Sequence, residues 1–389
     1  MSEQLSRAIT YFTEKTGIMS ELCIACGTGE RVTDAYSAGI GPETVFDLAS
    51  VTKLFTGLTI LRLRDEGLLS LEMKVTDAAP RFTGLTDVTV GQLMAFGVEL
   101  RTPGRIDACS DRASALQCLY GTKAIGTPGK RPYSDIPAMI LKYIAEGVCG
   151  EPFFEIVRRR VLIPAGMRET WSKVPAHRLA DCLNYSGEHR IEKGKRILRE
   201  GPATGIPHDP KAGILCGTDG DLCGHAGLFS TLPDMVRFCR AVLDGSIVSR
   251  KTLAEMAVNR TGHRMEDGTY RQYLGYQCYV KHPDQYYSEI PAYMSGSAVG
   301  IAGFTGNHLS VDPEKGIFAI FLGNRVKDRL TVLIPDEGKC WKDYGLEDDG
   351  PGMFRWDEHT VIQSSVNYVH RKDEHLHTEI CEILKEYAL

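Results

Sequence analysis

The stretch Asp47-Leu48-Ala49-Ser50-Val51-Thr52-Lys53 decides how the rest of this chain is interpreted. It ends an N-terminal segment with a β pattern and opens an apolar helical pattern. Ser50 and Lys53 are three residues apart, so they share one face of a helix. Ser50 would lie near the helix N-terminus, where backbone N–H groups favour negative charge. The position suits a serine nucleophile, although a Ser-x-x-Lys pattern is expected about once by chance in such a chain.

Composition sets broad limits on the function. The chain has 389 residues, of which 43% are hydrophobic and 24% charged, as in ordinary globular proteins large enough for two cores. The net charge of -5 gives no basic excess, so we expect neither a nucleic-acid nor a membrane partner. The longest apolar run, 317–322, is too short to span a bilayer, and the N-terminus lacks the apolar core of a signal peptide. These features predict a cytoplasmic protein.

Twelve scattered cysteines fit a reducing compartment. Cys23 and Cys26 form a Cys-x-x-Cys pattern within a predicted strand, where they would point to opposite faces. We therefore interpret them as core residues rather than metal ligands, and the sequence predicts no metal and no cofactor.

The order of the patterns predicts the architecture. Strand patterns occur at 19–39 and return only between 276 and 326, while helices are expected at 2–16 and 371–387. The middle reads as helices and loops, with 173–224 mostly irregular. We predict an α/β (α+β) fold, in which an antiparallel sheet is flanked by N- and C-terminal helices and a mostly helical domain is inserted. The predicted domains are 1–75 together with 232–389, and 76–231, with the active site at their interface.

A serine hydroxyl needs a base, and two candidates are available. Lys53 could act if it were neutral, or it could stabilise the phenolate of a tyrosine base. Tyr133-Ser134-Asp135 supplies such a tyrosine at the start of a predicted helix. Ser134 or Asp135 could instead cap that helix, which is the simpler interpretation of the triplet alone.

Other segments allow both a chemical and a structural interpretation. His225, between glycines in the run 224–231, could be an acid or base, but such a histidine is more often a structural hydrogen-bonding residue, and His208 has the same ambiguity. The histidines show no metal-binding spacing. The glycine-rich segment 300–306 could present a backbone N–H to an oxyanion, or could simply form a tight turn or bulge.

The order Ser50-Val51-Thr52-Lys53, Tyr133-Ser134-Asp135, Gly224 to Thr231 and Gly303-Phe304-Thr305-Gly306 resembles the serine β-lactamase-related superfamily. It is most similar to the class C branch, which contains class C β-lactamases, D,D-peptidase-like penicillin-binding proteins and esterases. The resemblance runs from about residue 10 to about residue 330.

The resemblance implies a role for each motif. Ser50 would be the acylated nucleophile, Lys53 would hold the site electrostatically and share its proton, and Tyr133 would be the base. The backbone N–H groups of Ser50 and Phe304 would form the oxyanion hole.

The chain departs from this family pattern at three places. The usual Lys-Thr-Gly, Lys-Ser-Gly or His-Thr-Gly triplet is replaced by Ile301-Ala302-Gly303, and isoleucine provides neither a cation nor an imidazole. Asp135 stands where class C β-lactamases usually have asparagine. Residues 95–99 differ from the turn found in many relatives. We expect the changes at 301–303 and 95–99 to make the cleft more apolar and to disfavour β-lactams and peptidoglycan stems, and the carboxylate of Asp135 to change the local charge and disfavour an anionic substrate.

The sequence therefore predicts a serine hydrolase acting through an acyl-Ser50 intermediate on a small carboxylic ester or amide with a fairly apolar acyl group. A β-lactamase or D,D-peptidase, a weakly catalytic ligand-binding relative and an acyltransferase remain as alternatives. A small-molecule substrate is the expected partner, and the oligomeric state is not predicted. The stretch 327–370 could cover the cleft or a sheet edge, or form a subunit contact.

Overall fold

The structure is a computed structural model that describes residues 2–216, 220–285, 289–348, 352–366 and 368–385. Its centre is a six-stranded sheet with the order β2-β1-β12-β11-β10-β9, in which all neighbouring strands are antiparallel. The strands are β1 Glu21–Thr28, β2 Val32–Tyr36, β9 Tyr279–Val280, β10 Val299–Ala302, β11 His308–Asp312 and β12 Ile317–Asn324. The first and last parts of the chain thus form one sheet, as predicted.

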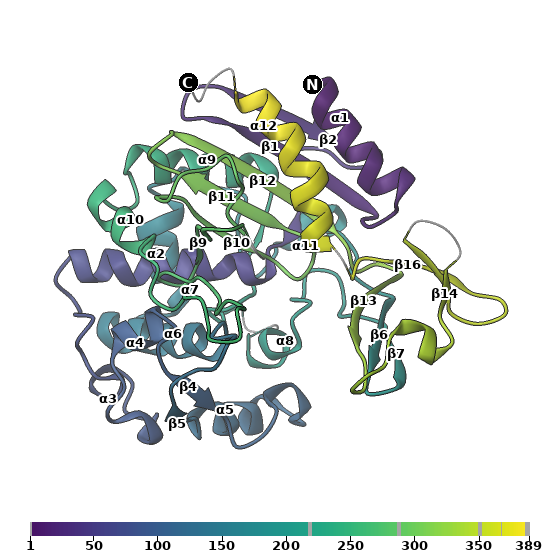
Figure 1. The fold of residues 1–389 in the computed structure, drawn as a ribbon. Coiled ribbons are helices and arrows are strands. Elements are labelled where there is room, and N and C mark those ends of the chain that lie inside the picture. The colour runs from purple at the N-terminus through teal and green to yellow at the C-terminus, as the bar shows by residue number, and fades with distance from the viewer. Residues whose placement is uncertain (1, 217–219, 286–288, 349–351, 367, 386–389) are drawn as a thin grey trace.

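Both faces of this sheet are buried, because successive side chains of β1 enter different cores. Cys23 packs in the main core and Cys26 in the second one, so the predicted opposite orientation of the two buried thiols is confirmed. Helices α1 (Glu3–Thr10) and α12 (His377–Leu384) lie side by side over the second core (Figure 1). These are the predicted flanking helices; positions 386 and 387 of the predicted C-terminal helix lie outside the described residues.

The other face of the sheet packs against helices. Helix α2 (Thr52–Asp65) follows a 3-10 turn at Ala49–Val51 and is buried on nearly all sides. It contacts α6 (Ile136–Cys149) of the helical part. Helix α9 (Leu232–Asp244) contacts β12, β1 and β11. Because α2 lies in the interior, a polar side chain on it needs partners within the protein.

The inserted part is mostly helical, as expected, and besides two strands of a second sheet it contains one short strand pair and one partner of another. Its helices are α3 Val75–Ala78, α4 Val90–Met94, α5 Arg112–Tyr120, α6, α7 Phe153–Val157 and α8 Pro210–Cys216, and α10 (Arg250–Met256) lies beyond it. The strand pairs are β4 (Glu99–Arg101) with β5 (Lys123–Gly126), and β3 (Phe46–Asp47) with β8 (Phe229–Ser230). The pair β3–β8 joins the residues before Ser50 to the run that contains His225.

A second six-stranded sheet, with the order β14-β15-β16-β13-β6-β7, lies to one side of the first (Figure 1). Its strands are β6 Glu188–Glu192, β7 Lys195–Arg199, β13 Arg329–Ile334, β14 Glu347–Asp348, β15 Met353–Arg355 and β16 Val361–Ser364. The prediction of an irregular 173–224 was wrong for β6 and β7, and for helix α8 in the same stretch. Both strands are rich in charged residues and weak in β propensity, and β6 is held by parallel pairing with the distant β13. This pairing joins segments that the sequence assigned to different domains.

In the part of the chain that the structure describes, no helix is both long and apolar enough to cross a membrane.

Candidate active site

Ser50 lies in the 3-10 turn that enters α2, and the turn is held by a buried carboxylate. Ala49 has a φ of +47°, a left-handed conformation that costs energy for a residue with a side chain. Asp47 supports it, because Oδ1 accepts a hydrogen bond from the Ala49 N–H (2.9 Å) and Oδ2 accepts one from the His208 N–H (2.7 Å). The carbonyl of Asp47 also accepts from Asn307 Nδ2 at 2.7 Å. Asp47 therefore ties the Ser50 turn to two other segments.

Lys53 is completely buried and points its ammonium at Ser50. Its Nζ lies 2.9 Å from Ser50 Oγ, 2.7 Å from Asp135 Oδ1 and 3.2 Å from the carbonyl oxygen of His225. Burial acts to lower the pKa of Lys53, but the charge of Asp135 and the proximity of Tyr133 outweigh it and raise the pKa. Lys53 therefore keeps its proton at neutral pH, and of the two candidate bases Tyr133 is the one that remains available.

The carboxylate of Asp135 forms ion pairs with two lysines and does not cap the helix that follows it. It occupies the N-cap position of α6, but its side chain caps no backbone N–H, so the capping interpretation is wrong for this residue. Its Oδ1 instead forms an ion pair with Lys53, and its Oδ2 forms one with Lys211 at 2.9 Å. Burial opposes ionisation of Asp135, yet Lys53, His225 and Lys211 hold its pKa well below the usual range. The carboxylate stays ionised and keeps Lys53 in place.

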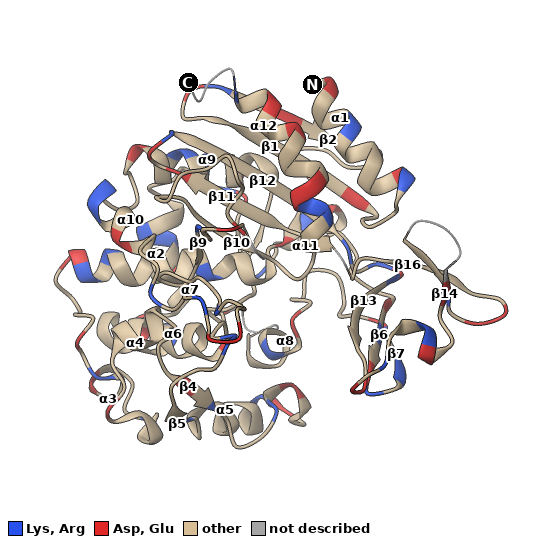
Figure 2. Cartoon of the chain, in the orientation of Figure 1, with Lys and Arg blue, Asp and Glu red and all other residues tan. Residues whose placement is uncertain are grey.

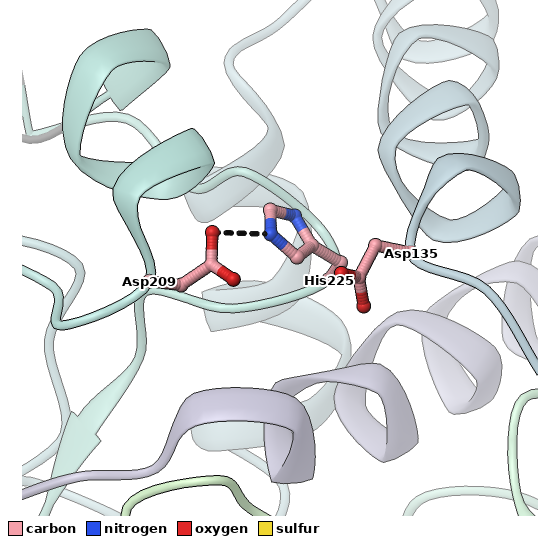
Figure 3. Close-up of side chains that lie close together, drawn as sticks. All are labelled: Asp135, Asp209 and His225. Carbon is pink, nitrogen blue, oxygen red and sulfur yellow. Dashed lines mark hydrogen bonds and ion pairs between the residues drawn. The ribbon is translucent and has the colours of Figure 1, made fainter. Parts of the chain in front are cut away.

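The network continues away from the nucleophile. Lys211 Nζ is 3.3 Å from Asp209, and Asp209 Oδ1 is 3.0 Å from His225 Nε2, the contact drawn as a dashed line in Figure 3. The ligating atoms of Asp135, Asp209 and His225 lie within 4.8 Å of one another, a separation that would suit a metal ion. The ammonium groups of Lys53 and Lys211 already bind these two carboxylates, so the set reads as an ion-pair network. His225 acts within it as a structural residue.

Tyr133 is fixed between two aromatic rings. Its ring stacks on Phe96 (centroids 5.5 Å apart) and on Tyr279 (5.4 Å), while Lys53 Nζ lies 4.9 Å from its centroid. Its backbone N–H donates to Gln272 Oε1 at 3.1 Å. Phe96 belongs to the segment that departs from the family pattern, and its structural role is to hold the ring of Tyr133.

The segment after β10 approaches the Ser50 turn closely. A Cβ atom on Gly303 would lie 2.6 Å from the carbonyl oxygen of Leu48, so this position requires glycine. Phe304 follows, and its N–H takes part in no hydrogen bond among the described residues. Ala302, Gly303 and Phe304 line the same cavity as Ser50. This placement is compatible with the predicted oxyanion role of the Phe304 N–H.

Ile301 differs from its neighbours because it is not a lining residue. Its side chain is fully buried in the main core. The replacement of the usual cation or imidazole at this position therefore removes a polar group without adding an apolar surface to the cavity.

The cavity in front of Ser50 has a volume of about 750 Å³ and is strongly charged. Ten lining residues are acidic or basic: Arg105, Asp107, Asp135, Arg190, Glu192, Arg199, Asp209, Lys211, Glu289 and Arg325. The expectation of an apolar cleft was wrong. Most of these residues lie outside the motifs from which that expectation was drawn. Several come from the second sheet, in which β6 carries charges of both signs and β7 carries basic residues (Figure 2).

A buried carboxylate organises this second wall. Glu188 Oε1 accepts from Thr331 (2.6 Å), and its two oxygens lie 3.3 and 3.1 Å from Arg190 and Arg199. Its Oε2 is 3.2 Å from His208 Nε2, and the His208 ring stacks on Phe304. Burial opposes ionisation, but hydrogen bonds from His208 and Thr331 and the nearby arginine charge lower the pKa of Glu188 to about 2. Sequence reasoning missed this residue, although the run Glu188-His189-Arg190-Ile191-Glu192 places its charges at alternate positions.

A serine on a helix-entering turn, a buried lysine three residues later, a tyrosine from the helical part and a glycine-bordered strand end reproduce the arrangement of motifs found in penicillin-recognising serine enzymes. The chain belongs to the Beta-lactamase family, whose sequence model matches residues 6–334. The structure thus has the fold and the order of motifs that the sequence resemblance predicted.

Similar proteins support this assignment at modest identity. The chain is 26% identical over 313 residues to a Salmonella enteritidis protein named "Putative D-alanyl-D-alanine carboxypeptidase", covering 73% of this chain and 70% of that protein. Among solved structures, a penicillin-binding protein homologue from Pyrococcus abyssi matches with a TM-score of 0.59 and 21% identity, over 82% of this chain and 73% of that chain. EstCE1, a hydrolase with promiscuous acyltransferase activity, matches with a TM-score of 0.64 and 18% identity, over 88% and 97%. The two structural matches show the shared fold.

Proposed function

We propose that the protein is a serine hydrolase that cleaves small carboxylic esters or amides through an acyl intermediate on Ser50. One observation supports this most strongly: the buried, charged Nζ of Lys53 lies 2.9 Å from Ser50 Oγ at the wall of a cavity that Tyr133 also lines. A purely structural lysine would have no need to point at the half-buried hydroxyl of a serine on a strained turn.

Each residue then has a defined task. Tyr133, as a phenolate stabilised by the ammonium of Lys53, accepts the proton of Ser50 as Oγ attacks the substrate carbonyl and becomes the neutral phenol. The N–H groups of Ser50 and Phe304 bind the oxyanion. The proton passes to the leaving alcohol or amine, which departs and leaves the acyl group on Ser50. Tyr133 then activates a water molecule that releases the acid and restores the serine.

A D,D-carboxypeptidase-like activity is the second candidate. The curated relatives carry that name, and the charged cavity removes one argument against carboxylate-bearing peptides. The absence of a cation at Ile301 still counts against close similarity in substrate binding.

Covalent labelling tests the proposal. We expect a fluorophosphonate to add one adduct to the wild type and none to Ser50→Ala, and Ser50→Ala to lower hydrolysis of p-nitrophenyl acetate at least about a thousandfold. Ser110→Ala, an exposed serine outside the cavity, should behave as the wild type. Intact mass and initial rates measure both effects.

Two outcomes would change the conclusion. Ester turnover that survives in Ser50→Ala would exclude Ser50 as the nucleophile. A long-lived penicillin adduct on Ser50 without ester turnover would favour the peptidase-like alternative.

A further inference from the structure

Arg325 follows β12 and lines the cavity, although only 9% of the residue is exposed. Its Nε donates to the carbonyl oxygen of Phe304 at 2.8 Å, and its Nη1 donates to the carbonyl oxygen of Ser365 at 3.2 Å. The guanidinium lies over the rings of Phe304 (4.8 Å to the centroid) and Tyr368 (5.5 Å). Nη2 takes part in no hydrogen bond among the described residues. The guanidinium is thus held at the cavity wall, and its Nη2 remains available to donate a hydrogen bond to a ligand.

Arg325 also has no carboxylate partner, which sets it apart from the other cations of the cavity. Among the described residues, each of the others forms an ion pair within 3.1 Å, namely Arg105 with Asp107, Arg190 with Glu192, Arg199 with Glu188 and Lys211 with Asp135. Glu188 and Glu289 are the carboxylates whose charges act on the pKa of Arg325. Both are already bound by other groups. Burying a cation without an anion is costly, so a bound anion would stabilise this site.

A second buried arginine shows that this arrangement is not simply how this chain packs guanidinium groups. Arg329, on β13, also lacks a carboxylate within ion-pair distance among the described residues, but its nitrogens donate to backbone and side-chain oxygens, including Gly17 and Gln363. It does not line the cavity. All three guanidinium nitrogens of Arg329 donate hydrogen bonds to the protein, whereas Nη2 of Arg325 donates none among the described residues.

We propose that Arg325 binds a carboxylate of the substrate and makes the enzyme selective for esters or amides that carry a carboxylate near the scissile bond. The inference rests on the proposed function of Ser50. The location fits, because Phe304 supplies the proposed oxyanion N–H and accepts from Arg325 through its carbonyl oxygen. A guanidinium matches the planar geometry of a carboxylate and holds its charge at any relevant pH. Arg325 would thus supply the cation that is absent at Ile301.

Four esters, two neutral and two anionic, test the proposal with wild type and Arg325→Met. Phenyl acetate is neutral, 4-acetoxybenzoate carries the carboxylate on the leaving group, and mono-p-nitrophenyl succinate carries it on the acyl group; p-nitrophenyl acetate is the neutral reference for the last. We expect kcat/KM for at least one anionic ester to fall roughly tenfold to a hundredfold in Arg325→Met, mainly through KM, while the neutral esters change less than about threefold. The anionic ester whose kcat/KM falls shows whether Arg325 binds a carboxylate on the acyl side or on the leaving-group side of the scissile bond.

Matched variants separate binding from structure. Arg329→Met removes a buried guanidinium outside the cavity and should leave the ratio of anionic to neutral kcat/KM unchanged. An equal loss for neutral and anionic esters in Arg325→Met would overturn the proposal, because Arg325 would then only position Phe304. A wild type that shows no selectivity for either anionic ester would also overturn it, with the proposed function intact.

A binding measurement keeps the two proposals distinguishable. If the wild type cleaves no ester, the proposed function fails, and calorimetric titration of 4-acetoxybenzoate and its neutral amide into Ser50→Ala tests Arg325 alone. Tighter binding of the carboxylate, lost in Ser50→Ala/Arg325→Met, supports the subsite. Equal binding of the acid and the amide, or binding unaffected by the second substitution, overturns it.

Discussion

Two buried cations differ in how they are neutralised: Arg325 lines the cavity, and Lys53 contacts the lining residue Ser50. Lys53 is bound by the carboxylate of Asp135 at 2.7 Å, whereas Arg325 is bound by carbonyl oxygens and aromatic faces. The protein thus provides the anion for the cation that acts on the nucleophile. It provides none for Arg325, and in the proposed mechanism this difference separates a charge that acts on Ser50 from one available to a ligand.

The two cations also belong to different parts of the fold. Lys53 is on α2, which is packed between the main sheet and the helical part. Arg325 lies where β12 ends and the chain leaves for β13 of the second sheet. Ser50 therefore lies in the turn that enters a buried helix, and part of the cavity wall is built by the sheet that joins distant segments. We expect substitutions on the first side to change the rate constant and those on the second to change selectivity.

The largest effect is expected from Lys53→Met, which removes the cation beside Ser50. We predict a loss of about a thousandfold or more in kcat for p-nitrophenyl acetate, because both the proton transfer and the charge balance at Tyr133 depend on the ammonium. Lys142→Met is the matched control, since Lys142 is also buried and ion-paired, with Glu146 (2.7 Å) and Asp221 (2.6 Å), but these partners do not line the cavity, whereas the Lys53 partners Ser50 and Asp135 do. It should lower stability and leave kcat nearly unchanged. Equal losses of kcat in both variants would show that Lys53 acts only through folding.

The next effect concerns Glu188, which neutralises the arginines beside Arg325. Because the pKa of Glu188 falls from 4.5 to about 2 on folding, its contribution to stability is complete above pH 4.5 and is lost as the pH drops toward 2. The expected size is about 3 kcal/mol. Urea unfolding of Glu188→Gln should show reduced stability at pH 7 and a flatter decline between pH 4.5 and 2. Glu155→Gln, which removes a surface ion pair with Arg158, should retain the wild-type dependence.

Glu188→Gln also tests the contrast between Arg325 and its neighbours. Without this carboxylate, Arg199 loses its ion-pair partner and could bind substrate anions as well. Selectivity for anionic esters should then rise relative to the wild type, whereas unchanged selectivity would show that Arg190 and Arg199 do not reach the substrate.

The first of these regions could be predicted from the sequence and the second could not. Ser50, Lys53 and Tyr133 belong to motifs whose order is informative, and the hairpin at 19–39 and the terminal helices have clear periodicity. Strands β6 and β7 have no such signal, because their charged residues are accommodated only by pairing with β13 and by the buried ion pairs of Glu188. The charged cavity depends on these tertiary contacts, so local sequence predicted an apolar cleft.

Individual residues show the same limit. The triplet Tyr133-Ser134-Asp135 predicts a helix start correctly, yet only the structure shows that Asp135 pairs with Lys53 and Lys211 rather than capping α6. Ile301 was correctly identified as lacking a cation, but its orientation into the core required the sheet register.

The smallest effect is expected from Asp135→Asn, which makes Lys53 resemble Arg325 as a cation held by neutral acceptors. Asparagine is usual here in class C β-lactamases, so the variant should fold and remain active. Asp135 raises the pKa of Lys53, and its removal lowers that pKa, so activity that needs the ammonium should decline at a lower pH on the alkaline side. At pH values below this alkaline decline, we expect about a tenfold loss in kcat, corresponding to roughly 1–2 kcal/mol for one partly exposed ion pair.

The pH profile decides whether the carboxylate acts through Lys53. Lys211→Met is the control, because it removes the second partner of Asp135 and leaves the contact between Asp135 and Lys53 in place. Its alkaline limb should stay near that of the wild type. If Asp135→Asn lowers kcat without moving the alkaline limb, Asp135 contacts the substrate directly. The distinction between the two cations would then lie in position alone, and not in the source of the neutralising charge.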